Sequence, residues 1–164
     1  MNQLLFVFLF VTYFNAVNCQ TARTTASGRV NVIQPLSITS TGGALNFGEI
    51  ILTGSIASYQ ITPAQGQQFR IIGNPGRSVS ITFSQISLSN SIWVSLNGGM
   101  VGSLTFTPTV VNSLNNPITS GNFYALLTSG TVAVLDIRVG GSITVSSSQP
   151  HGDYTGIFTI SVSY

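Results

Sequence analysis

The side chains able to act as acids, bases or metal ligands are few and scattered in this sequence. The one histidine, His151, lies two residues before Asp153, and the other two acids are Glu49 and Asp136. Side-chain catalysis requires a nucleophile beside a base, a pair of acids or a set of metal ligands, and the spacing around His151 fits no metal site. We therefore predict that the protein is not an enzyme and that it has no metal site and no cofactor. Two acids paired in space, as in a glycosidase, are the remaining enzymatic alternative.

Two other kinds of binding chemistry can be weighed from the residue types. Gly140 and Gly141 precede a strand-like run rather than a helix, so they do not form a phosphate-binding loop. Aromatic rings can bind sugars, and Trp93, Tyr59 and Tyr124 are the candidates for an aromatic platform. One hypothesis for function is therefore a carbohydrate- or surface-binding module, adhesin-like, on a self-complete β-sandwich.

The charged residues are rare and do not cluster. Only 5% of the residues are charged, and the five basic residues are all arginines spread along the chain. They form neither a basic stripe for nucleic acid nor a polybasic membrane patch. A surface built mostly of Ser, Thr, Asn, Gln and Gly does little to repel a second copy of itself. We expect the partners to be the protein itself or related surface subunits, and we expect no nucleic-acid partner.

The first 19 residues have the pattern of an export signal. Leu4 to Phe14 is almost wholly apolar, is followed by a short polar stretch, and is too short to span a bilayer comfortably. We predict a signal peptide over residues 1–19 and a mature chain that starts near Gln20, has no membrane span, and resides in the periplasm, on the cell surface or outside the cell. Attachment of a lipid to Cys19 is the alternative. Cys19 is the only cysteine, so the mature domain has no internal disulfide.

Beyond residue 19 the sequence predicts an all-β fold. Short alternating runs rich in Val, Ile, Thr, Phe and Tyr are separated by Gly, Pro, Asn and Ser, and no window has a convincing helical period. The runs predict strands near residues 30–38, 45–52, 56–62, 69–72, 79–83, 104–110, 132–139, 143–145 and 149–164; residues 86–101 are less regular, and residues 123–127 form a short strand or a helical turn. About seven to ten short strands at this spacing predict a single immunoglobulin-like β-sandwich over residues 20–164.

Turn residues and prolines add local detail to this prediction. Asn74, Pro75 and Gly76 predict a turn that makes residues 69–72 and 79–83 a hairpin or neighbouring strands. Pro35 and Pro108 predict edge positions or bulges, because proline has no N–H to donate to a sheet.

The last stretch, Gln149 to Tyr164, has the most regular alternation. One face carries Tyr154, Gly156, Phe158, Ile160, Val162 and Tyr164, and the other face is mostly polar. This period of two predicts a strand with one buried face. Because the sequence ends on this strand, we expect its free edge to be paired by an earlier segment or by another molecule.

Five motifs occur in the order found in a known family. They are Val-x-Val-x-x-Pro-Leu-x-Ile (Val30 to Ile38), Leu-Asn-Phe-Gly (Leu45 to Gly48), Gly-x-Pro-Gly (Gly73 to Gly76), Gly-Gly-x-Ile-x-Val (Gly140 to Val145) and Gly-x-Tyr-x-Gly-x-Phe-x-x-x-Val-x-Tyr (Gly152 to Tyr164). The ordered set resembles a bacterial family of exported all-β proteins catalogued as a domain of unknown function, which is similar to spore-coat protein U and to chaperone–usher pilin subunits.

The resemblance implies a pilin-like sandwich that builds fimbria-like or coat-like assemblies, with a periplasmic chaperone as a further partner. In pilins, the amino-terminal extension of the next subunit fills the place of a missing strand. Residues 20–28 would begin such an extension here. The resemblance implies a donor strand with Ala22, Thr24, Ala26, Gly28, Val30 and Val32, and an acceptor strand with Phe158, Ile160, Val162 and Tyr164.

The small residues of the extension leave a second arrangement open. Ala22, Thr24 and Ala26 would each bury little apolar area, at roughly 25 cal/mol per Å². The alternative is that residues 21–32 pair within their own domain and complete its fold.

Overall fold

The computed structural model describes residues 23–130 and 132–164. The chain divides into two compact units, one ending at Asn31 and one from Val32 to Tyr164, and each is described by itself. In the first unit, residues 23–31 form neither helix nor strand, and their side chains are exposed. The predicted signal peptide over residues 1–19, with Cys19, lies outside the described residues, as does Ala22.

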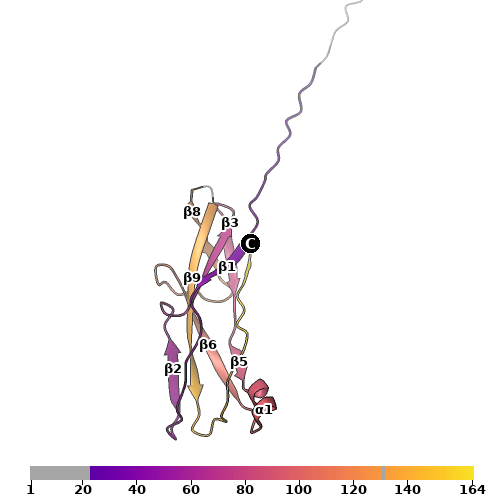
Figure 1. Cartoon of the computed structure of the whole chain (residues 1–164). Coiled ribbons are helices and arrows are strands. Elements are labelled where there is room, and N and C mark those ends of the chain that lie inside the picture. Colours follow the sequence, from indigo (N-terminus) through magenta and orange to yellow (C-terminus); the bar gives the residue numbers. More distant parts are fainter. Residues whose placement is uncertain (1–22, 131) are drawn as a thin grey trace, which may run out of the picture. The chain divides into compact units, whose positions relative to one another are not determined.

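The second unit is an all-β sandwich, which confirms the predicted fold class (Figure 1). Its described part contains ten strands and one short helix, α1 (Ser91–Asn97). The strands are β1 (Ser37–Gly42), β2 (Ala57–Ile61), β3 (Gln67–Gly73), β4 (Ser78–Thr82), β5 (Ile86–Ser89), β6 (Ser103–Asn112), β7 (Phe123–Ala125), β8 (Leu127–Ser129), β9 (Val132–Val145) and β10 (Ser161–Ser163).

Two antiparallel sheets form the layers of the sandwich. The larger sheet has the order β1-β3-β9-β6-β5, and β2 and β8 also pair with β9. The smaller sheet has the order β10-β4-β7. Both prolines predicted at edges fit this topology: Pro35 lies just before the edge strand β1, and Pro108 lies on β6 beyond the end of its partner β5. The smaller sheet has short strands and covers only part of the larger one.

Strand β9 is the axis of the larger sheet, and it changes partner along its length. Val139 pairs with Gln67 of β3, and two residues later Gly141 pairs with Ile61 of β2. The turn between β2 and β3 lies against Gly140, where a Cβ atom would collide with the carbonyl oxygen of Ile61. Glycine at this point therefore lets one 14-residue strand serve both partners.

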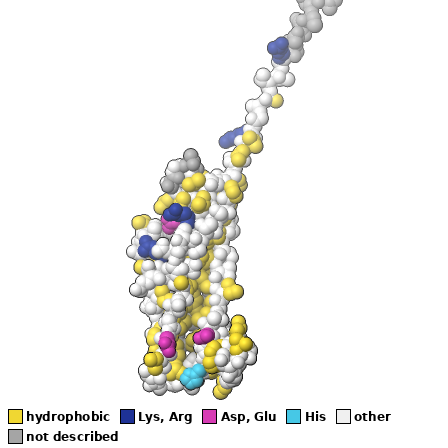
Figure 2. Space-filling model, in the orientation of Figure 1, with side chains coloured by type: hydrophobic (Ala, Val, Ile, Leu, Met, Phe, Trp, Pro, Cys, Tyr) yellow, Lys and Arg dark blue, Asp and Glu magenta, His cyan; other side chains and the backbone are white. Residues whose placement is uncertain are grey.

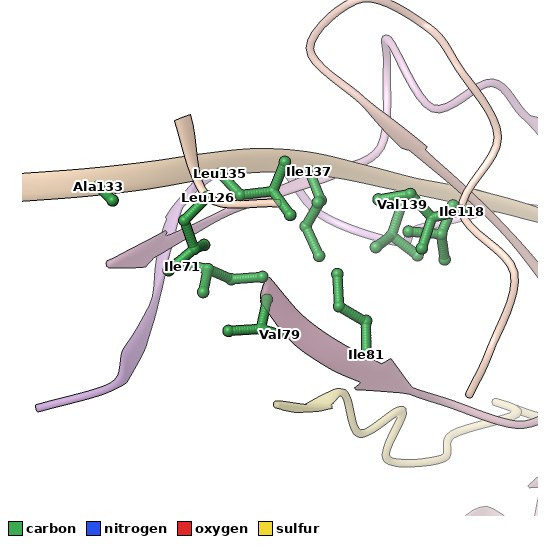
Figure 3. Close-up of a cluster of buried hydrophobic side chains, with 10 residues drawn as sticks. Ile71, Val79, Ile81, Ile118, Leu126, Ala133, Leu135, Ile137 and Val139 are labelled. Atoms are coloured by element: carbon green, nitrogen blue, oxygen red, sulfur yellow. The ribbon is translucent and has the colours of Figure 1, made fainter. Parts of the chain in front are cut away.

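The alternation of each strand places apolar residues between the layers, where they form two core clusters. In the first cluster, Val79 and Ile81 of β4 point toward Ile71 of β3 and Ile137 of β9 (Figure 3). All four side chains are fully buried. The second cluster consists of Leu104, Phe106, Ile143 and Val145 and lies along the other half of β9 and β6. No strand of the smaller sheet covers this second cluster among the described residues.

Three of the predicted strands are wrong in whole or in part. Of the predicted strand at 30–38, only Ser37 and Ile38 belong to a strand, β1, and residues 30–36 form none. Residues 45–52 form no strand: the Asn46 side chain accepts a hydrogen bond from the Gly48 N–H at 2.9 Å, and Gly48 has φ 71°, so the chain bends there. The closing strand is shorter than predicted, with only Ser161–Ser163 in a ladder. Its alternation is nevertheless real, since Ile157 is 87% exposed whereas Phe158 packs against both clusters.

Other predicted elements differ in connection or type. Residues 132–145 form one continuous strand rather than two. Strands β3 and β4 lie in different sheets, so they are neither a hairpin nor neighbouring strands of one sheet. The turn between them is confirmed, because the Arg77 N–H donates to the Asn74 carbonyl at 3.3 Å. Residues 91–97 form a helix where none was predicted, and residues 123–125 form a strand. In the described ranges 23–130 and 132–164, no helix has the length and apolarity needed to cross a membrane.

Candidate functional site

A groove with a volume of about 700 Å³ lies over the second core cluster. Its floor is the larger sheet, where Leu104, Ile143 and Val145 line it. One wall is the segment 45–52, which we call the amino-terminal wall, and the other is the segment 149–156, which we call the carboxyl-terminal wall. Trp93 of α1 also lines the groove. Figure 2 shows hydrophobic side chains between polar ones on this unit, with two acidic groups beside the histidine near one end.

Neither wall is fully joined to a sheet. Within the described part of the chain, no backbone–backbone hydrogen bond involves residues 45–52 or residues 156–159. Thr155 makes an isolated bridge to Ser89, and the chain joins β4 only from Ser161 onward. Backbone N–H and C=O groups without backbone partners, beside an apolar floor, are the groups with which an added β-strand would pair.

Aromatic side chains hold the amino-terminal wall, and Phe158 just beyond the carboxyl-terminal wall, onto the larger sheet. The Phe106 ring, on β6, contacts Phe47 of the amino-terminal wall at 6.1 Å and Phe158 at 5.6 Å between ring centroids, both edge to face. Edge-to-face pairs of this kind are attractive beyond the area that they bury. The amino-terminal wall is therefore anchored through side chains, whereas the carboxyl-terminal wall is also joined to β5 by the two backbone hydrogen bonds between Thr155 and Ser89.

A buried asparagine fixes the end of the groove near α1. Asn90 is fully buried, and its Nδ2 donates to the carbonyl oxygens of His151, at 2.7 Å, and Met100, at 3.2 Å. Its Oδ1 accepts from the Gly102 N–H at 2.7 Å. This one side chain thus ties the chain on both sides of α1 to the turn that begins the carboxyl-terminal wall.

The same turn is closed by a tyrosine. The Tyr154 hydroxyl donates to the carbonyl oxygen of Pro150 at 2.7 Å and accepts from Gln149 Nε2 at 2.8 Å. Sequence reasoning missed both Asn90 and Tyr154 as site-forming residues. Tyr154 could have been suspected from its place on the apolar face of the closing segment, whereas Asn90 has no sequence signal that separates it from a loop asparagine.

The groove carries two of the three acids of the chain. Glu49 lies on one wall and Asp153 on the other, and both are exposed. The third acid, Asp136, is on β9 and accepts two hydrogen bonds from Arg70, at 2.7 Å and 2.9 Å. These hydrogen bonds lower the pKa of Asp136 and raise the pKa of Arg70. The rim of the groove is therefore acidic, with no arginine among its lining residues.

The predicted acceptor residues lie along the carboxyl-terminal segment but outside the groove. Phe158, Ile160 and Val162 pack against the first core cluster of their own chain. The Tyr164 hydroxyl accepts from the Asn74 N–H at 2.8 Å and donates to the Gln34 carbonyl at 3.2 Å. The groove instead uses residues 149–156 of the same segment, so the role of these four residues as acceptors stays a prediction.

The predicted donor residues lie at the junction of the two units. Ala22 is not described, Thr24, Ala26, Gly28 and Val30 belong to the first unit, and Val32 begins the second. Val30 is 85% exposed and Val32 is 86% exposed. Their role as a donor strand stays a prediction.

The three aromatic residues predicted to form a sugar platform do not lie together. Tyr59 of β2 packs against the second core cluster, Tyr124 of β7 packs against the first, and Trp93 lines the groove. That prediction is wrong as a shared surface, because two of the rings serve separate parts of the core. Across residues 23–130 and 132–164 there is no group of three or more His, Cys, Asp or Glu placed to hold a metal ion.

Fold and groove together define a class: an all-β sandwich in which one layer is incomplete beside a groove with an apolar floor and a polar rim. The chain belongs to the family described as a domain of unknown function, DUF4402, whose model matches residues 20–164. This match confirms the family predicted from the five motifs, and it covers the whole of the predicted domain. No curated protein matches the chain.

Proposed function

We propose that the protein is a structural subunit of an exported surface assembly, fimbria-like or coat-like, whose copies associate by β-strand addition. The observation that carries the proposal is the groove, because both of its walls include backbone groups without backbone partners among the described residues. In strand addition, main-chain hydrogen bonds provide affinity and side-chain pockets provide register. An incomplete layer over a packed sheet offers an incoming strand both main-chain hydrogen-bonding groups and side-chain pockets.

The motifs that carry the resemblance to spore-coat protein U and pilin subunits support the same proposal. The motif from Leu45 to Gly48 begins the amino-terminal wall, and the motif from Gly152 to Tyr164 runs along the carboxyl-terminal wall. A third motif, Gly140 to Val145, contributes Ile143 and Val145 to the floor, so three of the five motifs take part in the groove. A surface with only 5% charged residues also gives little repulsion between copies.

Export is part of the proposal. Residues 1–19 serve as the signal peptide, the mature chain acts in the periplasm, on the cell surface or outside the cell, and a periplasmic chaperone is a transient partner that covers the groove before assembly. The mass of the mature protein recovered after export checks the first step: a chain that keeps residues 1–19 would contradict it.

Sedimentation velocity over a wide concentration range tests the assembly. The chain from Gln20 to Tyr164 should form dimers or larger species, and a variant that lacks residues 20–33 should sediment as a monomer with the same melting temperature. A full chain that stays monomeric at every concentration would refute the proposal. Equal association by the shortened chain would also refute it, because the added strand would then have another source.

The second candidate function is glycan or surface binding, and Trp93 is the observation that favours it. Its ring lines the groove together with Glu49 and Asp153, side chains that can accept hydrogen bonds from sugar hydroxyls. Binding on a glycan array that is lost in Trp93→Ala and kept in Tyr59→Phe would support this function. An array without signal for the full chain would exclude it for the glycans tested.

A further inference from the structure

We infer that the end of the sandwich that carries α1 inserts into the surface of a lipid bilayer with zwitterionic headgroups. The inserting part, which we call the apolar tip, consists of two residues of α1 and two of the loop that follows it: Ile92, Leu96, Met100 and Val101. This inference goes beyond the proposed function and does not depend on strand addition, since none of the four residues lines the groove.

The apolar tip is exposed to a degree that is unusual for large apolar side chains. Ile92 is 68% exposed, Leu96 80%, Met100 76% and Val101 62%. Helix α1 has no buried residue, and Figure 2 shows hydrophobic side chains gathered over it at the lower right. Single exposed apolar residues are ordinary on a protein surface, whereas a group of them marks an interaction site.

The fold closes the base of the loop that carries the tip. The Asn90 N–H donates to the Gly102 carbonyl at 3.4 Å, and Asn90 Nδ2 donates to the Met100 carbonyl at 3.2 Å. These hydrogen bonds bring Met100 and Val101 back to the residue that precedes α1. The two apolar residues after the helix therefore lie at the same end of the sandwich as the two within it.

The helix turns one apolar face toward the sandwich and the other away from it. The Trp93 ring is partly buried and lies against the carboxyl-terminal wall, where a Cβ atom on Gly152 would be 2.8 Å from the ring. Ile92 and Leu96 are four residues apart and share another face of the helix, which is exposed. Trp93 thus anchors the helix, and the outward face has no partner within the described part of the chain.

Polar groups near the tip find hydrogen-bond partners within the helix itself. Ser95 Oγ donates to the Ile92 carbonyl at 2.7 Å, and Asn97 Nδ2 donates to the Trp93 carbonyl at 2.9 Å. Polar groups that enter lipid must be satisfied by the protein, because no water is there to pair with them. Ser95 and Asn97 therefore let the helix approach hydrocarbon at a reduced desolvation cost.

The distribution of charge identifies the kind of bilayer. No charged residue and no histidine occurs between Arg77 and Asp136, so the tip carries no charge that insertion would dehydrate. Surface anchors that select anionic lipids carry lysine or arginine beside their apolar residues. The groove that Trp93 also lines carries the acids Glu49 and Asp153 instead. This end of the sandwich therefore suits zwitterionic headgroups and disfavours anionic ones.

The hollows of the sandwich do not match the tip of a second copy. The groove has an acidic rim, and its three floor residues are only 3–7% exposed, which is too little apolar surface to cover four large side chains. The smaller hollow, about 150 Å³, is lined by Arg70, Asp136 and Arg138. A bilayer needs no preformed pocket, because lipids rearrange around the side chains that enter it.

Vesicle flotation tests the inference with the chain from Gln20 to Tyr164, which omits the apolar run within residues 1–19. The chain should bind vesicles of phosphatidylcholine. Ile92→Ser combined with Leu96→Ser should weaken this binding at least about tenfold, because apolar area leaves the bilayer. Both side chains are exposed, so the melting temperature should stay within about 5 °C of the wild-type value.

Leu114→Ser is the matched control for the loss of an exposed leucine. Leu114 is 71% exposed and follows β6, whereas the tip precedes the other end of that strand. Its replacement should change vesicle binding less than about twofold. Binding that is equally weak in Leu114→Ser and in the double variant of α1 would overturn the assignment to the tip.

Trp93 reports the insertion directly, because it is the one tryptophan in the sequence. Phosphatidylcholine vesicles should shift its emission to the blue. Lipids brominated near the headgroup should quench it more than lipids brominated near the end of the acyl chain, since the ring lies at the base of the tip. The double variant of α1 should show neither change. An unchanged shift in that variant would mean that another surface meets the lipid.

The arginines before the sandwich provide the test of lipid charge. Arg23→Gln combined with Arg29→Gln should leave binding to phosphatidylcholine unchanged, and added salt should not weaken it, because no ion pair contributes. The same variant should bind phosphatidylglycerol vesicles more weakly than phosphatidylcholine vesicles, since Glu49 and Asp153 then face anionic headgroups. Loss of phosphatidylcholine binding in this variant would assign the membrane contact to residues 20–33 and overturn the inference.

The outcomes also separate a bilayer from a protein partner. If the wild-type chain does not bind phosphatidylcholine vesicles, the inference is wrong. If, in addition, the double variant of α1 loses self-association in sedimentation velocity, the tip is a contact between copies instead. Neither result decides strand addition, which is tested by the variant that lacks residues 20–33.

Discussion

At the scale of single residues, Asn90 has the largest predicted effect on stability. Replacing it with alanine removes three side-chain hydrogen bonds and leaves the Gly102 N–H and the carbonyl oxygens of Met100 and His151 without these partners. Each buried polar group left unpaired costs about 1–3 kcal/mol, so Asn90→Ala should lower the free energy of unfolding by at least that amount. Chemical denaturation of both proteins measures the difference.

Asn97→Ala is the matched control for Asn90→Ala. Asn97 ends α1, is exposed, and makes one side-chain hydrogen bond, from its Nδ2 to the Trp93 carbonyl at 2.9 Å. We expect its loss to change stability within about 0.5 kcal/mol. Equal destabilisation by the two variants would show that Asn90 does not hold the groove end together.

The ion pair between Arg70 and Asp136 gives the predicted pH dependence. Hydrogen bonding to Arg70 lowers the pKa of Asp136 in the folded state, so the pair stabilises the protein above the pKa of the unfolded carboxyl and loses its effect as the pH falls through the folded value. Both side chains are well exposed, so the effect is small. Asp136→Asn should lower the melting temperature by less than about 3 °C at neutral pH and not at all near about pH 2.

Arg70→Gln provides the partner for a double-mutant cycle on this pair. The melting temperature should fall by about as much in each single variant as in the double variant, because either change removes the same contact. A difference between wild type and Asp136→Asn that grows as the pH falls would contradict the assigned direction of the pKa.

At the scale of elements, the partner exchange on β9 depends on Gly140. A Cβ atom there would meet the Ile61 carbonyl and the Pro63 nitrogen, both backbone atoms that cannot rotate away. Gly140→Ala should therefore lower the free energy of unfolding by roughly 1–3 kcal/mol or more. Thr144→Ala, at an exposed position of the same strand, should change it by less than about 0.5 kcal/mol. A neutral Gly140→Ala would mean that the turn between β2 and β3 can lift away from β9.

Side-chain alternation predicted which residues face the core, but it could not predict which segments find strand partners. Ile157 is exposed and Phe158 packs against the core, as the alternation of side chains along a strand requires. Whether extended chain becomes a strand depends on a neighbour with free backbone groups, and residues 45–52 have none in the described part. The same period of two therefore gives a ladder at 161–163 and an unpaired segment at 156–159.

The helix and the groove carried weaker signals in the sequence. Helix α1 has seven residues, no side-chain cap and no buried residue, so neither apolar periodicity nor a capping motif marked it. Glu49 and Asp153 are separated by more than a hundred residues, and only the sandwich brings their two segments to one groove. The alternation of the amino-terminal residues could be read from the sequence, whereas the groove required the three-dimensional arrangement.

At the scale of the whole molecule, amide hydrogen exchange on the intact chain tests whether the incomplete layer is filled by association. Below the concentration at which copies associate, amides of residues 45–52 and 156–159 should exchange quickly, because no backbone acceptor protects them among the described residues. Amides of β9, with partners on both sides, should exchange slowly.

Above that concentration, both walls should gain protection together with residues 28–33, since a strand between the walls satisfies amides of all three segments. Protection of β9 should change little and thus serves as the internal control. Variant Val30→Ser combined with Val32→Ser should keep the fast exchange of both walls at the same concentration. Walls that are already protected in the dilute monomer would mean that the groove is closed within one copy, and strand addition would then have no free edge to use.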